Sequence, residues 1–154
     1  REILMREAKK YTKEFVNEKR AMGELDHPES SVVNLQNVSH NITEMHWEGD
    51  NLLGTVEILT TPSGNILREL FKSNIKLGIS SRGMGSVETV SEGPAAGAQK
   101  VGNDFELIAF DFVSNPSTHG AFMYPMNESV DKQQGRTCGD YCKVESIIND
   151  ILRG

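Results

Sequence analysis

The sequence predicts an α+β domain. Apolar residues recur at helical spacing near the start of the chain, an alternating pattern follows from about residue 38, and a capped helical segment then precedes several short apolar runs. With 154 residues, of which 37% are hydrophobic and 25% charged, the chain is long enough to bury a core of its own. We therefore expect residues 1–154 to form a single domain.

The first predicted element is an amphipathic helix over residues 1–22. Gly23 is a suitable helix terminator, which places His27 on a turn just beyond the helix. Pro28 disfavours helical geometry at His27 and helps to fix that turn. The apolar positions that recur on one helix face are Leu4, Ala8, Tyr11 and Phe15.

A β-hairpin is predicted over residues 38–59, because alternating apolar and polar residues flank a Gly49-Asp50-Asn51 turn. Thr61 followed by Pro62 is typical of a helix N-cap and first helical position, and predicts a short helix over about residues 63–75. The remaining elements are expected in this order: strands 77–81 and 86–91, a loop over 92–102, strands 105–113 and 120–124, a polar linker over 127–143, and a C-terminal amphipathic helix over 144–153.

One acid stands out within the predicted strand over residues 105–113. This run is apolar except for Glu106 and Asp111, and a carboxylate in such a run is costly to bury without a partner. A histidine that the carboxylate orients would be such a partner. The alternative is that Asp111 faces solvent or caps the following turn.

Two short runs carry the residue types that nucleophilic catalysis needs. GELDHP at residues 23–28 offers the imidazole of His27, and GISSRGMGS at residues 78–86 offers the hydroxyls of Ser80 and Ser81. A serine hydroxyl needs a base to take its proton and dipoles to stabilise the resulting oxyanion. Adjacent side chains of an extended segment point to opposite faces, so only one of the two serines can face the histidine without a kink.

These two strings, in this order and at this separation, resemble the prohead core protein proteases of T-even-type tailed phages, which are serine endopeptidases of viral capsid maturation. The resemblance covers about residues 1–117 and includes MHWEGD at 45–50 and VSNPS at 113–117. It implies an assemblin-like fold, in which helices surround a largely antiparallel, barrel-like sheet.

The resemblance also assigns site residues. The family's histidine falls on His27 and its nucleophile on Ser80. We expect Asp111 to be the third member, although herpesvirus assemblins use a second histidine there, which leaves His119 as the alternative. Beyond these assignments, Arg82 and Gly83 are the candidates for substrate binding, although Arg82 could instead hold the loop, neutralise nearby carboxylates or be a solvated surface residue. Backbone N–H groups near the glycine-rich segment or on an opposing loop are expected to hold the oxyanion.

The implied function is cleavage of scaffolding-core and capsid proteins, after glutamate, inside the assembling prohead in the host cytoplasm. The resemblance implies no metal or organic cofactor, and other copies of the protease are expected partners. A different possibility is a noncatalytic structural or assembly subunit of the prohead that keeps the protease fold.

Composition excludes several other classes. The net charge of −6 and the pI near 5.2 argue against a nucleic-acid-binding domain. No apolar run approaches the roughly 20 residues that span a bilayer, and no secretory signal pattern is present. Because the chain begins with Arg1 in the middle of a helical pattern, we expect an N-terminally trimmed chain.

The two cysteines, Cys138 and Cys142, leave a further possibility. Their spacing could supply two ligands of a zinc-dependent binding module, completed by His40, His46 or His119. Free thiols are expected instead, because structural zinc sites usually show a clearer second pair of ligands and the cytosol is reducing.

Overall fold

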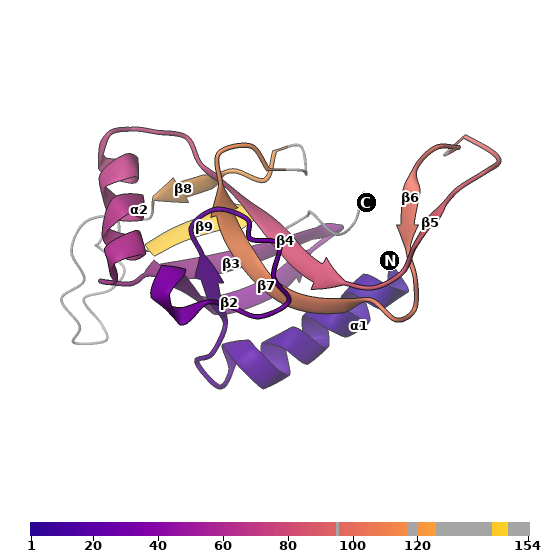
Figure 1. Ribbon diagram of the computed structural model, residues 1–154, viewed down its shortest axis with the longest axis horizontal. Helices are drawn as coiled ribbons and strands as arrows, with labels where there is room; N and C mark the ends of the chain where they lie inside the picture. Colours follow the sequence, from indigo (N-terminus) through magenta and orange to yellow (C-terminus); the bar gives the residue numbers. More distant parts are fainter. Residues whose placement is uncertain (95, 117–119, 126–142, 148–154) are drawn as a thin grey trace.

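A computed structural model describes residues 1–94, 96–116, 120–125 and 143–147, and in these parts of the chain helices flank antiparallel sheets (Figure 1). The α+β class and the antiparallel pairing are confirmed. Helix α1 spans Glu2–Tyr11 and helix α2 spans Pro62–Lys72. The strands are β1 (Met22–Glu24), β2 (Val38–Glu48), β3 (Asn51–Ile58), β4 (Gly78–Met84), β5 (Val87–Thr89), β6 (Gln99–Val101), β7 (Glu106–Val113), β8 (Met123–Pro125) and β9 (Lys143–Ile147).

The strands form three separate ladders. The largest sheet has the order β1-β2-β3-β9-β8, while β4 pairs with β7 and β5 pairs with β6. Single bridges, Leu25 to Phe112 and Gly78 to Phe122, connect the β4–β7 ladder to segments that flank the larger sheet. The expected barrel-like sheet is therefore only partly confirmed, because no closed barrel forms within the described residues. At the two places where the β4–β7 ladder meets the larger sheet, isolated bridges replace continuous strand pairing.

The first helix ends earlier than the sequence predicts. A π-helical turn (Thr12–Val16) follows α1, and Lys19 then adopts a positive φ of 55°. Arg20 N–H donates to the Phe15 carbonyl and Lys19 N–H donates to the Val16 carbonyl, which is the Schellman arrangement of a helix C-terminus. Gly23, expected to end the helix, instead lies within β1.

The central hairpin and α2 agree with the sequence. Gly49, with φ of 61°, connects β2 to β3, and the two strands pair antiparallel from His40–Ile58 to Glu48–Asn51. Thr61 accepts a hydrogen bond from Gly64 N–H at 3.0 Å and caps α2, with Pro62 as the first helical residue. The helix packs on β2 and β3.

Two segments differ from expectation. Residues 92–102 were expected to be a loop, but Gln99–Val101 form β6 and pair with β5 in a two-stranded arm that extends from the body (Figure 1). Lys143–Ile147, expected as the last linker residue and the start of a helix, form β9 between β3 and β8. Pairing with two strands satisfies their backbone groups on both sides, which outweighs a helical apolar pattern. Residues 126–142 and 148–154 lie outside the described residues.

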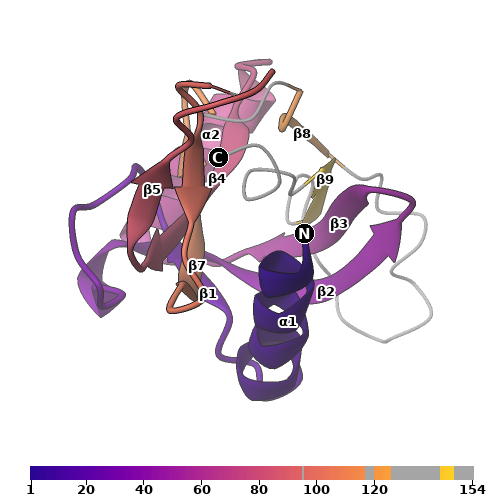
Figure 2. The same cartoon turned by 90° about the vertical axis from the view of Figure 1, so that its right-hand side faces the viewer.

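The core lies between the sheets and the two helices. Helix α1 packs along β7 (Figure 2). Tyr11 of this helix meets Phe110 of β7 edge to face, with ring centroids 5.6 Å apart. Phe71 of α2 meets Phe112 of β7 in the same way at 5.8 Å. Strand β7 therefore contributes aromatic rings to the core, with a buried Ile79 beside them on β4. None of the helices in the described part of the chain is long and apolar enough to cross a membrane.

His40 is fully buried in this core and is held in one neutral tautomer. Its Nε2 lies 2.8 Å from the Phe110 carbonyl, which can only accept, so Nε2 carries the proton. Its Nδ1 lies 2.7 Å from the Ser39 hydroxyl, which donates to it. Burial lowers the pKa of His40 from 6.5 to about 4, and the hydrogen bond to Phe110 opposes that change.

We predict that His40 makes folding sensitive to acid. Because the folded-state pKa lies below the unfolded one, its contribution to stability is present above pH 6.5 and is lost as the pH falls towards 4. The free energy of unfolding should fall by about 3 kcal/mol more in the wild type than in His40→Gln between pH 7 and pH 4. Urea denaturation at both pH values measures this difference. Equal pH dependence of the two proteins would contradict it.

Gly23 lies where a side chain does not fit. A Cβ atom at this position would overlap the Phe110 carbonyl oxygen and the His40 ring. We predict that Gly23→Ala lowers the free energy of unfolding by about 3 kcal/mol, since neither the β7 backbone nor the buried ring can move away cheaply. Gly49→Ala is the matched control. A Cβ atom added at Gly49 would meet open space, so the positive φ of this residue is the reason that Gly49→Ala loses stability, by about 1 kcal/mol. Equal losses in chemical denaturation would rule out the steric explanation.

Candidate active site

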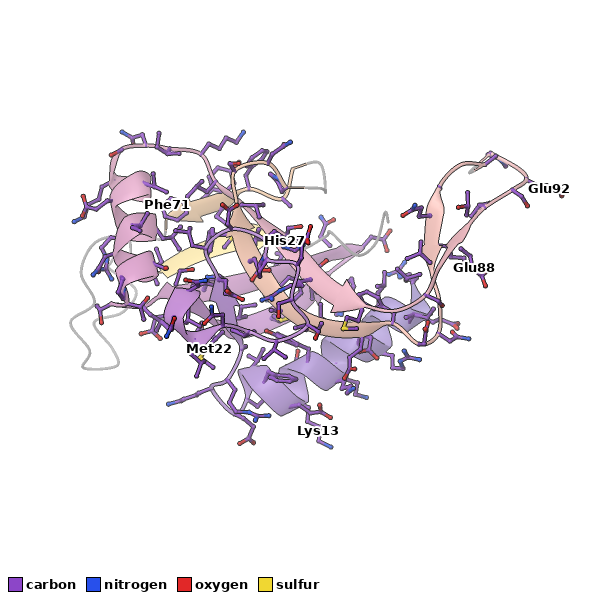
Figure 3. All side chains as sticks on the ribbon, in the orientation of Figure 1. Lys13, Met22, His27, Phe71, Glu88 and Glu92 are labelled. Atoms are coloured by element: carbon purple, nitrogen blue, oxygen red, sulfur yellow. The ribbon has the colours of Figure 1, made fainter. Side chains whose placement is uncertain are left out.

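His27 follows β1 on a segment that runs beside β7. Asp26 N–H donates to the Phe112 carbonyl at 2.8 Å, and Asp26 adopts a φ of 72°, a conformation that aspartate tolerates better than most residues. Pro28 then limits the backbone of His27 to extended geometry. These contacts turn the imidazole towards β7, while the side chain stays 44% exposed. In Figure 3 His27 lies over the β4–β7 ladder, far from the arm that carries Glu88 and Glu92.

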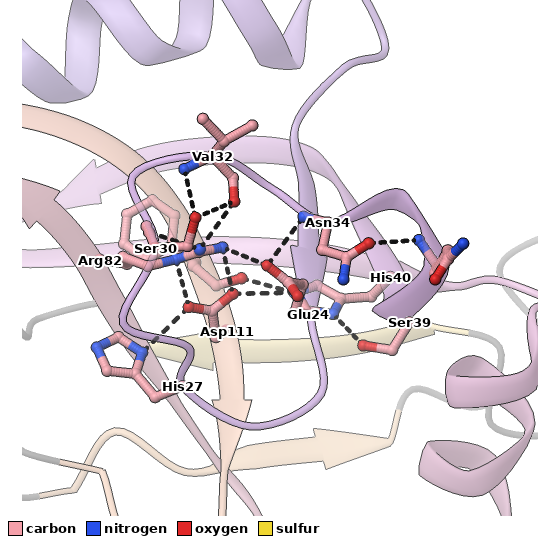
Figure 4. Close-up of polar contacts among 11 residues, drawn as sticks. Glu24, His27, Ser30, Val32, Asn34, Ser39, His40, Arg82 and Asp111 are labelled. Carbon is pink, nitrogen blue, oxygen red and sulfur yellow. Dashed lines mark hydrogen bonds and ion pairs between the residues drawn. The ribbon is translucent and has the colours of Figure 1, made fainter.

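Asp111 is the partner of His27, as the sequence analysis expected. The Nδ1 atom of His27 lies 3.1 Å from Asp111 Oδ2, and the Asp111 side chain is 0% exposed (Figure 4). A carboxylate only accepts hydrogen bonds, so Nδ1 carries the proton in this pair. In the neutral imidazole this leaves Nε2 without a proton, which is the tautomer that can act as a base.

Strand register places Ser80 on the same face of the ladder as Asp111. Ser80 of β4 is directly opposite Asp111 of β7, and side chains of directly opposed residues share a face with Cβ atoms roughly 5 Å apart. Ser81 is opposite Phe110, whose ring is fully buried in the core. Register thus separates the two serines: Ser80 is on the Asp111 face, and Ser81 is on the face of the core aromatics. Ser80 is 6% exposed, so the site meets solvent mainly at His27.

Arg82 lies behind this site and not on the surface. Its side chain is 5% exposed, and its Nη2 donates to Glu24 Oε2 at 3.0 Å and to Asp111 Oδ1 at 3.2 Å. Its Nε lies 3.0 Å from Asp111 Oδ2 but is not aligned for a hydrogen bond. Its Nη1 donates to the Ser30 carbonyl at 2.9 Å (Figure 4). The guanidinium that was expected to bind substrate is engaged by internal groups.

The two oxygens of Asp111 therefore have different partners. Oδ1 accepts from Glu24 N–H at 3.0 Å and from Arg82, whereas the aligned partner of Oδ2 is His27. Burial raises the pKa of the Asp111 carboxyl, and the Glu24 N–H, the Arg82 guanidinium and the His27 imidazole oppose that rise. These donors favour the carboxylate that a histidine partner requires.

Gly83, also expected to bind substrate, follows a β-bulge between Arg82 and Gly83 and is exposed. A Cβ atom at Gly83 would overlap the Phe105 ring. The absence of a side chain thus lets β4 approach Phe105 closely next to the site.

Glu24 is the buried site residue that sequence reasoning missed. It belongs to the GELDHP run, but an acid followed by Leu25 and Asp26 carries no pattern that predicts burial. The signal that could have found it is Arg82: a buried arginine requires acidic partners, and the strand pattern of β4 already places Arg82 on the Ser80 face.

Other candidates lie outside the described residues or away from the site. His119, Cys138 and Cys142 belong to the part of the chain that the structure does not describe. Within the described ranges no three histidine, cysteine, aspartate or glutamate side chains gather to hold a metal ion. A cavity of about 530 Å³ between α1 and the β2–β3 hairpin is lined by Met5, Lys9, Met45, Trp47 and Leu52 among others, and by none of the site residues above.

Comparison with known proteins gives consistent results. A family model described as prohead core protein serine protease matches residues 1–132. The prohead core protein protease of Enterobacteria phage T4 is 31% identical over 128 residues, which are 80% of this chain and 58% of that relative. The solved structure of the bacteriophage T4 capsid assembly protease has a TM-score of 0.66 at 28% identity, over 73% of this chain and 67% of that one. The chain thus spans 58% of the length of the curated relative, and it belongs to the prohead core protein serine protease family.

Proposed function

We propose that this chain is a serine endopeptidase of phage prohead maturation, with Ser80 as nucleophile, His27 as base and Asp111 as the residue that orients the base. The observation that carries the proposal is the hydrogen bond of 3.1 Å between His27 Nδ1 and a buried Asp111, directly across the ladder from Ser80. In serine peptidases a carboxylate orients an imidazole in this way, and the imidazole takes the proton of a serine hydroxyl.

In this mechanism the Ser80 hydroxyl oxygen attacks the peptide carbonyl while His27 Nε2 accepts its proton. Asp111 stabilises the imidazolium that forms, and backbone N–H groups near the glycine-rich end of β4 stabilise the oxyanion. His27 then gives its proton to the leaving amine. Water hydrolyses the acyl-enzyme with His27 as base again, so the reaction requires no metal or organic cofactor.

The proposed substrates are the scaffolding-core and capsid proteins of the prohead, cleaved after glutamate, and the proposed place of action is the assembling prohead in the host cytoplasm. Family membership supports this assignment. A role for Gly83 in substrate binding fits its exposure beside the bulge. Substrate binding by Arg82 stays a prediction, and it requires the guanidinium to leave Glu24 and Asp111.

Co-expression with a T4-type scaffolding-core protein tests the proposal. We expect the wild type to cleave the core protein at glutamate and His27→Ala to leave it intact, as mass spectrometry of the products would report. His46→Ala is the matched control, since His46 is a half-exposed histidine on β2 whose contact at 3.9 Å is with Glu44. Cleavage by His27→Ala at the wild-type rate would exclude the proposed base. An uncleaved core protein with the wild type would favour the noncatalytic assembly subunit.

A further inference from the structure

Glu24 is a buried acid that contacts both charged groups behind His27. Its side chain is 2% exposed. Its Oε2 accepts hydrogen bonds from Arg82 Nη2 at 3.0 Å and from Asn34 N–H at 3.2 Å. The backbone N–H of the same residue donates to Asp111 Oδ1 at 3.0 Å. Figure 4 shows the carboxylates of Glu24 and Asp111 next to the Arg82 guanidinium.

Glu24 adds a second carboxylate to the buried side chains behind His27. Arg82 alone would offset the charge of Asp111, because its guanidinium lies 3.0 Å from that carboxylate. With Glu24 present, two carboxylates face one guanidinium, and the buried cluster keeps a net negative charge. A negative charge near an imidazole favours its protonated form. His27 takes up a proton in the proposed reaction, so the charge stabilises the state that forms as the serine attacks.

Glu24 also determines how the donors of Arg82 are shared. Glu24 accepts a hydrogen bond from Nη2 of Arg82. The backbone carbonyls of Ser30 and Val32 accept from Nη1 at 2.9 and 3.5 Å. Held in this way, the guanidinium approaches Asp111 Oδ2 without hydrogen-bond alignment. Oδ2 thereby keeps its aligned hydrogen bond for His27.

The other titratable groups near this cluster do not supply the same charge. Burial raises the pKa of the Tyr11 phenol, and the charge of Asp111 adds to the rise, so Tyr11 stays neutral at physiological pH. His40 of β2, which is paired with Gly23 of β1, is neutral because burial lowers its pKa to about 4. Asp26, next to His27 in sequence, is exposed, and water screens its charge.

We propose that Glu24 is a positioning residue of this active site: it restrains Arg82 and thereby leaves Asp111 the net charge and the aligned oxygen that stabilise the His27 imidazolium. This inference rests on the function proposed above, because it takes His27 as the base. In this proposal Arg82 is a buried partner of Glu24 and Asp111.

The test compares Glu24→Gln with Glu7→Gln. Glu7 is a matched control, since its side chain is 6% exposed and accepts from Arg6 and from Leu107 N–H, away from His27. We expect Glu24→Gln to lower the pKa of His27, followed by NMR, by about one unit relative to wild type. Its kcat on the core protein should fall on the order of tenfold with KM changed by less than about twofold. Glu7→Gln should match wild type in all three.

A double variant keeps the test decisive if Glu24→Gln does not fold. Glu24→Gln with Arg82→Met removes one charge of each sign and restores the net charge of the cluster, and replacing a buried ion pair by neutral groups is often tolerated. We expect its His27 pKa to lie within about half a unit of wild type. The inference is overturned if folded Glu24→Gln keeps the wild-type His27 pKa or kcat, or if the double variant lowers the His27 pKa by a unit or more. Failure of the wild type to cleave would instead overturn the proposed function, because the NMR titration does not depend on cleavage.

Discussion

Ser80→Ala is expected to lower kcat for cleavage of the core protein by about 10⁶-fold, whereas Ser81→Ala keeps the rate within about threefold of wild type. The two residues differ by one position, but strand register separates their faces. Ser80 is opposite Asp111 and Ser81 is opposite Phe110. Loss of the Ser80 hydroxyl removes the attacking atom, and neither the base nor the oxyanion dipoles can replace it.

The adjacent serine is the control for this prediction, because both substitutions remove one hydroxyl from the same strand. Cleavage products separated by gel electrophoresis and identified by mass spectrometry give the rate for each variant. If Ser81→Ala is inactive and Ser80→Ala cleaves normally, the register assignment of the nucleophile is wrong.

Asp111→Asn is expected to have the second largest effect, a fall in kcat of about 10⁴-fold with little change in KM. The asparagine side chain is close in size, but it carries an N–H₂ group and no charge. Arg82 and the Glu24 N–H both donate to the Oδ1 position, so the asparagine carbonyl oxygen is expected to take that position. The N–H₂ group then takes the Oδ2 position and faces His27 Nδ1. The imidazole would then carry its proton on Nε2, the tautomer that cannot act as the base.

Two further variants make the Asp111 prediction specific. Asp104→Asn changes an exposed aspartate that accepts from Ser86 near the arm, and it should retain wild-type activity. His119→Ala tests the alternative third member and should also retain activity. An active Asp111→Asn together with an inactive His119→Ala would replace Asp111 by His119 in the mechanism.

Sequence reasoning could nominate the candidate site residues because each of them carries a local signal. Ser80 and His27 come from two strings that resemble a family, and Asp111 follows from the cost of burying a carboxylate in an apolar strand. The structure brings His27 and Asp111 within hydrogen-bond distance. The catalytic roles of these residues remain predictions that the variants above test.

The remaining errors arise where distant segments decide the local structure. Gly23 is suited to a helix end, but it lies in β1, where the His40 ring and the Phe110 carbonyl leave no room for a side chain. The apolar repeat near residue 144 suits a helix, but open edges of β3 and β8 are available for pairing. Arg82 was expected to bind substrate, and only the arrangement of β1, β4 and β7 shows that two acids contact its buried side chain. Local patterns do not contain these long-range contacts.

Chemical labelling tests the central claim most directly, namely that His27 activates Ser80 as a nucleophile. A fluorophosphonate reacts with an activated serine hydroxyl and releases fluoride, and peptide mass spectrometry locates the adduct. We expect the wild type to carry the adduct on Ser80, and His27→Ala to remain unlabelled under the same conditions. An adduct on Ser81, or equal labelling of Ser80 with and without the imidazole, would contradict the account.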